Sequence, residues 1–211
     1  MGKLMHHIMG LLTACAVVVG VSVSCRPQGG GAEFKDIPVD SVRNGDIVFR
    51  RGRSFSSGMI LAHDKGSSYS HIGIVCRLDT MLCVVHAVNE EPDFEGDFDR
   101  VKMEPLECFF SKERASAGAM YHSWIGDSLS AILTARAMQL ARDSVRFDAS
   151  FNHHDRSELY CTELVYHLYE GVGIDITQGR RTKVGIMSFP DEVIFPDDIQ
   201  ENKNIIKYFE F

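Results

Sequence analysis

The chain has 211 residues, 45% of them hydrophobic and 24% charged, which is enough for one sizeable domain with a hydrophobic core. The net charge is −7, from 22 basic and 29 acidic residues, so we expect no nucleic-acid partner, because such partners require a basic face. Apolar residues recur along the whole length without an internal repeat, which excludes a disordered chain, a coiled coil and a solenoid.

The first 24 residues are typical of a bacterial export signal. Lys3 provides a positive charge, and the segment from Met9 to Val23 is almost wholly apolar. Such a stretch has the length of the apolar region of a signal peptide and is short for a membrane span, which needs about 20 residues. We therefore predict a signal peptide over residues 1–24.

Cys25 directly follows the small residue Ser24 at the end of this apolar region, an arrangement similar to a bacterial lipoprotein processing site. The similarity is incomplete, because Ser22 stands where such a site usually has Leu. Cys25 is the predicted lipidation site, and plain secretion or an uncleaved N-terminal anchor are the alternatives. Residues 25–35 are predicted to form a flexible tether, and residues 36–211 a single domain.

Apolar runs and turn residues predict strands in the first half of the domain. In chain order, these elements are a strand at 47–49, a loop with a short helix at 52–68, a hairpin formed by 71–78 and 82–88, an exposed acidic loop at 89–100, and strands within 101–110 and 121–125. The hairpin turn is placed at Asp79-Thr80, which separates the two most apolar runs.

Helices are predicted later in the chain. The first is capped by Asp127-Ser128 and runs to about Arg146, and the second runs from near Tyr160-Cys161 to Gly171 or Gly173. The apolar face of the first helix is predicted to contain Leu129, Ile132, Leu133, Ala137, Leu140 and Ala141. Short strands around 184–186 and 193–195 and a packed tail at 205–209 complete the domain. Strands first and helices later indicate an α+β fold.

Cys161 lies at the start of the second predicted helix. Unpaired N–H groups and the helix dipole favour an anion there, so we expect the thiol of Cys161 to titrate at lower pH than a free cysteine. The alternative is a buried free cysteine of the core, a common role for this residue type.

Two histidines of the predicted hairpin accompany this cysteine. A two-residue turn pairs residue i with residue 159 − i, which places His86 opposite Gly73 and on the same face as His71. A shift of two residues would place the histidines directly opposite each other, and a turn of odd length would place them on opposite faces. A thiol, an imidazole that takes its proton and a second group that orients the imidazole together form an activated nucleophile.

Other readings of the same residue types remain open. Two His and one Cys are also a zinc ligand set, to which His153, His154 or His167 would add, but carboxylates with fitting spacing are not evident. We expect no metal and no cofactor. The register also places Cys76 opposite Cys83, as two packed core thiols or, at a slightly long separation, as a disulfide.

Three blocks of sequence carry a family resemblance. They are residues 45–52 (GDIVFRRG), 69–75 (YSHIGIV) and 160–165 (YCTELV), supported by Phe147-Asp148 and by residues 195–198 (FPDD). Between about residues 38 and 200 the chain resembles the YiiX/YaeF-like enzymes, which are circularly permuted papain-like proteins of the NlpC-type superfamily and are related to lecithin retinol acyltransferase. The resemblance implies an antiparallel sheet or small barrel packed against helices.

The resemblance also implies roles for three residues. Cys161 corresponds to the nucleophile, His71 to the general base, and His86 to the third polar residue, where many YiiX-like members have Glu and the acyltransferase relatives have His. The expected function is an exported cysteine amidase or peptidase of the bacterial cell envelope, lipid-anchored to the membrane, that cleaves cell-wall peptides or small amides. The alternatives are acyl-ester or acyl-lipid chemistry on the same fold and a non-catalytic binding module.

Overall fold

A single antiparallel sheet of six strands forms the centre of the domain in the computed structural model, which describes residues 37–63, 68–152, 154–184 and 190–211. The strand order is β4-β3-β2-β1-β5-β8, so the sheet is open with β4 and β8 at its edges. The strands are β1 (Ile47–Gly52), β2 (His71–Leu78), β3 (Met81–Val88), β4 (Arg100–Pro105), β5 (Ala115–His122) and β8 (Ile206–Glu210), with a separate pair formed by β6 (Thr182–Lys183) and β7 (Glu192–Val193). The predicted α+β class with an antiparallel sheet is confirmed.

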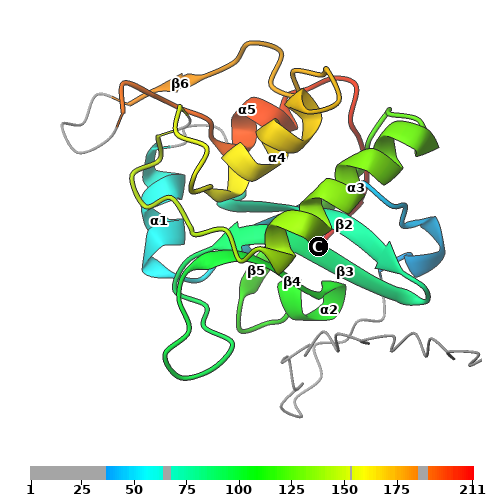
Figure 1. Cartoon of the computed structure of the whole chain (residues 1–211), viewed down its shortest axis with the longest axis horizontal. Coiled ribbons are helices and arrows are strands. Elements are labelled where there is room, and N and C mark those ends of the chain that lie inside the picture. Colours follow the sequence, from blue (N-terminus) through cyan, green and yellow to red (C-terminus); the bar gives the residue numbers. More distant parts are fainter. Residues whose placement is uncertain (1–36, 64–67, 153, 185–189) are drawn as a thin grey trace, which may run out of the picture.

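The helices lie on both faces of this sheet. They are α1 (Phe55–His63), α2 (Leu106–Phe109), α3 (Asp127–Arg142), α4 (Cys161–Glu170) and α5 (Pro196–Gln200). Figure 1 shows α3 and α4 over one face, with α5 beside α4. Inward-facing residues of that face, including Ile72, Ile74 and Val85, form the larger core with Leu133 and Leu164 of the two helices.

The opposite face of the sheet has a smaller core. Val75 and Val84 pack there against Leu106 and Phe109 of α2. Because side chains alternate along a strand, β2 and β3 divide their residues between the two cores. The odd-numbered positions of β2 and the even-numbered positions of β3, which include both histidines, therefore belong to the α2 side.

The β2–β3 hairpin has the predicted register. Asp79 and Thr80 form the two-residue turn, with Asp79 at φ 51°, and Ile74 pairs with Val85. Cys76 and Cys83 face each other directly, as predicted, and both are free thiols.

Helix α3 departs from the prediction at both ends and on its face. Gly126 occupies the N-cap without a side-chain hydrogen bond, and the helix ends at Arg142. Leu129 and Ile132, predicted to be buried, are 36% and 56% exposed. Ser130 and Thr134 are buried instead, against the turn before β1. The Ser130 hydroxyl donates a hydrogen bond to the carbonyl of Asn44, and the side-chain amide of Asn44 donates to Oγ1 of Thr134 at 2.9 Å.

The other elements match the prediction to different degrees. Helix α1 and helix α4, which is capped by Gly171, lie where they were predicted, and β8 joins the tail to β5. Strand β5 begins at Ala115, several residues before the predicted start, because it pairs with β1 along its whole length. The predicted strand at 184–186 lies partly outside the described residues, and β6 ends at Lys183.

The predicted signal peptide and tether, residues 1–35, with Cys25, lie outside the described residues. Within the described part of the chain, no helix combines the length and the apolar character needed to cross a membrane.

Gly73→Ala is expected to lower the free energy of unfolding by about 1–3 kcal/mol, because an added methyl group would overpack the hairpin. A Cβ at this position would lie 2.5 Å from Val84 Cγ1, 3.0 Å from the carbonyl oxygen of Val85 and 3.2 Å from His86 Cβ. Urea denaturation measures the effect. The matched control is Gly58→Ala on α1, where no atom lies within 4 Å of the added carbon. Equal stability of the two variants would contradict this account of Gly73.

Candidate active site

The hairpin brings His71 and His86 into direct contact. Nε2 of His71 lies 2.8 Å from Nδ1 of His86, and the two rings meet edge to face with centroids 5.0 Å apart. Both side chains are buried, and both rings pack against Phe109 of α2. The predicted same-face placement of the two histidines is confirmed. Gly73 allows this contact, because a side chain there would collide with Val84 and with the carbonyl oxygen of Val85 and would press on the Cβ of His86.

Cys161 is the first residue of α4, and α4 packs on β2. The backbone N–H groups of Ile72, Thr162 and Cys161 itself lie near its sulfur and act to lower the pKa of the thiol. Ile72 directly follows His71 in β2, so the thiol lies at the end of the strand that carries the first histidine. Two segments that are far apart in sequence thus meet at one point of the sheet.

Burial dominates the electrostatics of the thiol. It raises the pKa of Cys161 to about 11, although the three N–H groups and the guanidinium of Arg50 act in the opposite direction. The expectation that the helix start lowers the pKa below that of a free cysteine is therefore wrong for the unliganded enzyme. Cys161 is only 4% exposed, and the loss of hydration costs the thiolate more than the helix terminus returns.

The imidazole of His71 is also neutral at rest. Burial holds its pKa well below the usual value, and the positive charges of Arg50, Lys102 and Arg114 act in the same direction. A neutral thiol and a neutral imidazole are thus the resting state near pH 7. A thiolate on Cys161 therefore requires a proton transfer at the time of reaction, because the two groups do not form a permanent ion pair in this state.

Glu104 lies behind the two histidines and was not identified from the sequence. Its Oε1 is 3.1 Å from Nε2 of His86, and both groups are buried. Strand β4 pairs His86 with Lys102 and Val84 with Glu104, so Glu104 is diagonal to His86 as His86 is to His71. Alternation places Lys102 and Glu104 on one face of the predicted strand. The long connection from β3 leaves the register open, so the pattern alone could not assign the partner.

Glu104 belongs to a charge cluster of three bases and three acids on the α2 side of the sheet. Its members are Arg50, Lys102, Arg114, Glu91, Asp93 and Glu104. Arg50 pairs with Glu91, Arg114 pairs with Glu104, and Lys102 lies 2.9 Å from Asp93. Opposite charges balance within the cluster, which leaves both histidines free to remain uncharged.

The predicted exposed acidic loop at residues 89–100 is confirmed for most of its residues, but two of its acids join the cluster. Glu91 and Asp93 turn inward to reach Arg50 and Lys102, and only other side chains of the segment, such as Phe94, face solvent. The sequence shows only that this segment is acidic, which predicts a solvated surface. The bases that pair with Glu91 and Asp93 lie on strands distant in sequence, so these ion pairs could not be predicted.

The zinc alternative does not fit the donors. Within the described residues, no three or more His, Cys, Asp or Glu side chains are grouped to hold a metal ion. The ring nitrogens of His71 and His86 contact each other and Glu104, and His167 lies between Glu163 and Glu170 on α4, 3.2 and 3.3 Å from their carboxylates. His153 lies outside the described residues. We therefore derive no reaction step through a metal.

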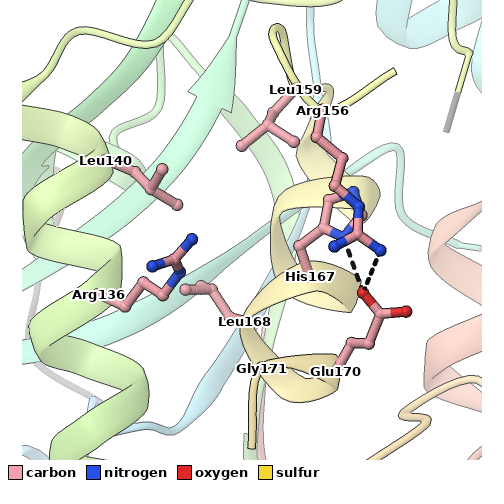
Figure 2. Close-up of a pocket in the computed structure, with 8 residues that line it drawn as sticks. All are labelled: Arg136, Leu140, Arg156, Leu159, His167, Leu168, Glu170 and Gly171. Atoms are coloured by element: carbon pink, nitrogen blue, oxygen red, sulfur yellow. Dashed lines mark hydrogen bonds and ion pairs between the residues drawn. The ribbon is translucent and has the colours of Figure 1, made fainter. Parts of the chain in front are cut away.

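A hollow of about 580 Å³ lies between α3 and α4, separate from the histidine pair. It is lined by Arg136, Leu140, Arg156, Leu159, His167, Leu168, Glu170 and Gly171. Figure 2 shows Arg136 and Leu140 of α3 facing Leu168 of α4, with the ion pair of Arg156 and Glu170 at the other side. Its lining contains neither Cys161 nor either hairpin histidine, so this hollow is not the candidate active site.

This arrangement defines a papain-like cysteine hydrolase: an antiparallel sheet packed on helices, with a cysteine at the start of one helix. The histidine precedes the cysteine in the chain, which is the circularly permuted order. The chain belongs to the family described as permuted papain-like amidase enzyme, YaeF/YiiX, C92 family, whose profile matches residues 41–205. This match confirms the resemblance seen in the three sequence blocks. The protein is therefore a cysteine hydrolase of the amidase or peptidase type.

A solved structure supports the same fold. The chain is similar to the structure of metalloprotein yiiX from Escherichia coli O157:H7, with a TM-score of 0.65 and 19% identity, over 80% of this chain and 97% of that one. At this sequence identity the similarity shows the fold alone. The description as a metalloprotein is a property of the yiiX protein and is not carried over to this chain. No curated protein matches the chain.

The rate of alkylation of Cys161 by iodoacetamide is expected to rise continuously from pH 7 toward about pH 11, because only the thiolate reacts and burial raises the pKa of Cys161 to about 11. Mass spectrometry of the labelled peptide measures the rate. A Cys161→Ser variant gives the background from Cys76 and Cys83, whose pKa values burial also raises. A rate that reaches its plateau below pH 8 would show a thiolate–imidazolium pair in the free enzyme and contradict the neutral resting state.

Proposed function

We propose that this cysteine hydrolase is exported and cleaves amide bonds in cell-wall peptides or related small amides, with Cys161 as nucleophile, His71 as general base and His86 as orienting residue. The observation that carries the proposal is the meeting of α4 and β2. The proposal is supported by the position of Cys161 at the start of α4, near the N–H of Ile72, and by the neighbouring residue His71, whose Nε2 lies 2.8 Å from Nδ1 of His86.

The hydrogen bond between the histidines leaves one nitrogen of His71 for the reaction. Since Nε2 is occupied by His86, Nδ1 is the atom that receives the proton from the Cys161 thiol. The sulfur then forms a bond to the carbonyl carbon of the amide, and the carbonyl electron pair moves to its oxygen. The backbone N–H of Cys161 is the proposed donor to this oxyanion.

Collapse of the tetrahedral intermediate breaks the C–N bond. His71 returns its proton to the departing nitrogen, which leaves as a neutral amine, and a thioester remains on Cys161. Water then loses a proton to Nδ1 of His71 as its oxygen attacks the thioester carbonyl. The acid product departs, and the proton returns to the sulfur.

Arg50 provides a further electrostatic contribution. Its guanidinium lies over the ring of Phe109, 4.6 Å from the centroid, and donates to the Phe109 carbonyl at 2.9 Å. From this fixed position its positive charge favours the thiolate of Cys161 and disfavours protonation of His71 before substrate binds. The first effect favours transfer of the proton from Cys161 to His71, and the second opposes it, so Arg50 keeps His71 neutral until substrate binds.

Acyl-ester or acyl-lipid chemistry is the second candidate. In this chain the third polar position is occupied by His86. The acyltransferase relatives also have His at this position, whereas many YiiX-like members have Glu. The thioester route is the same for an ester, with an alcohol instead of an amine as the leaving group. A binding module without catalysis would not require Cys161, His71 and His86 together.

The wild-type enzyme is expected to form a thioacyl adduct on Cys161 with a member of a panel of wall peptides, small amides and acyl esters. Intact-protein mass spectrometry detects the adduct, and the substrate that gives it distinguishes amide from ester preference. Cys161→Ala should abolish the adduct and turnover while the domain remains folded, because Ala leaves only a small cavity. An adduct on another residue, or turnover by the Ala variant, would contradict the assignment.

Export and lipid attachment at Cys25 form the cellular part of the proposal. A glycine-rich tether of about 10 residues spans roughly 15–20 Å, which would hold the hydrolase close to the membrane face of the envelope. The acyl chains would provide the attachment, because the domain itself is acidic.

Cys25→Ala is therefore expected to move the protein from the detergent phase to the soluble fraction, because it removes the acylated residue. Detergent phase partitioning of fractionated cells measures the change. Cys15 is the competing site, because Leu12-Thr13-Ala14 before it fits a lipoprotein processing site better but leaves a shorter apolar stretch. Cys15→Ala should leave the partitioning as in the wild type. Unchanged partitioning of Cys25→Ala would instead favour an uncleaved N-terminal anchor, and soluble wild-type protein would favour plain secretion.

A further inference from the structure

We propose that Glu104 is a positioning residue that sets the tautomers of both histidines, so that His71 presents an unprotonated Nδ1 to Cys161. The inference rests on the proposed roles of Cys161 and His71 and adds to them a residue on a third strand. Glu104 does not touch the reacting atoms and acts through His86.

Glu104 and His86 face each other through two buried atoms. Oε1 of Glu104 and Nε2 of His86 are 3.1 Å apart and buried, and neither atom completes a well-aligned hydrogen bond with any group in the described structure, so this short contact is the one through which the two side chains interact. A buried polar atom without a partner is costly, so each of these atoms depends on the other. A carboxylate only accepts hydrogen bonds, so Nε2 of His86 must be the donor.

The direction of this contact determines the tautomers of both histidines. A neutral imidazole has one N–H, so His86 with its proton on Nε2 has a lone pair on Nδ1. Nε2 of His71 lies 2.8 Å from that lone pair and must therefore be the donor. The proton of His71 is then on Nε2, and its Nδ1 has the lone pair that accepts the thiol proton.

The charge cluster keeps Glu104 in the accepting, ionised form. Its Oε2 pairs with Arg114, and Lys102 and Arg50 each lie 3.9 Å from one of its oxygens. Burial alone would raise the pKa of Glu104, but His86, Arg114 and Lys102 lower it to well below its usual value. When His71 becomes an imidazolium during the reaction, the same negative charge stabilises it through His86.

Glu104→Gln provides a sharp test, because Arg114 determines the orientation of the new amide. Arg114 is a donor, so the amide oxygen introduced by the substitution is expected to remain on its side and the NH₂ group to face His86. Nε2 of His86 would then accept, its proton would move to Nδ1, and His71 would be protonated on Nδ1. Both histidines would then have the opposite tautomer, and Nδ1 of His71 could no longer accept the thiol proton.

Two-bond ¹H–¹⁵N NMR spectra of the histidine rings read the tautomers directly, without a substrate. Both His71 and His86 are expected to carry the proton on Nε2 in the wild type and on Nδ1 in Glu104→Gln.

Glu91→Gln is the matched control, because Glu91 also pairs with Arg50 and Arg114 but does not contact a histidine. This variant should keep the wild-type tautomers. Glu104→Asp retains the carboxylate and should keep them as well, even if Glu104→Gln does not fold.

A wild-type His86 with its proton on Nδ1 would overturn the proposal, and so would wild-type tautomers in a folded Glu104→Gln. Since the NMR measurement does not involve turnover, its outcome is independent of whether the proposed amide substrate is correct.

Discussion

The register of the β2–β3 hairpin is the constraint on which the candidate site depends. Pairing of Ile74 with Val85 places His86 opposite Gly73 and diagonal to His71, so that the two rings contact each other. A slip of one residue would turn one histidine to the α3 and α4 side and separate the pair. The two-residue turn and the division of apolar residues between two cores both specify this register, and Gly73 provides the space that the contact needs.

Burial and charge are balanced differently on the two faces of the sheet. The side of α3 and α4 is apolar and holds the helix that carries Cys161. The side of α2 contains the histidines and the charge cluster, whose opposite charges offset one another. Ion pairs of this kind add little net stability, because desolvation cancels most of their attraction, whereas the loss of one partner is costly. The cluster therefore serves the neutrality and orientation of the histidines more than the stability of the domain.

The same balance explains the resting state of the nucleophile. A helix N-terminus stabilises an anion by about 0.3–1 kcal/mol, or up to about 2 kcal/mol in a partly buried site. A pKa of about 11 for Cys161 corresponds to a net penalty of roughly 3 kcal/mol relative to a free thiol, so burial is the larger effect. A neutral thiol is also less open to oxidation and unspecific alkylation, which suits an enzyme expected in the cell envelope.

Local patterns were sufficient to determine much of this protein from its sequence. Alternation and the Asp79-Thr80 turn determined the hairpin and the shared face of His71 and His86, and helix signals determined the position of Cys161 at the start of α4, because each depends on neighbours close in the chain. Only the tertiary structure decided the buried face of α3, the inward turn of Glu91, the high pKa of Cys161 and the contact of Glu104 with His86. Each of these depends on the register of strands joined by long connections and on burial by distant segments, which local periodicity does not encode.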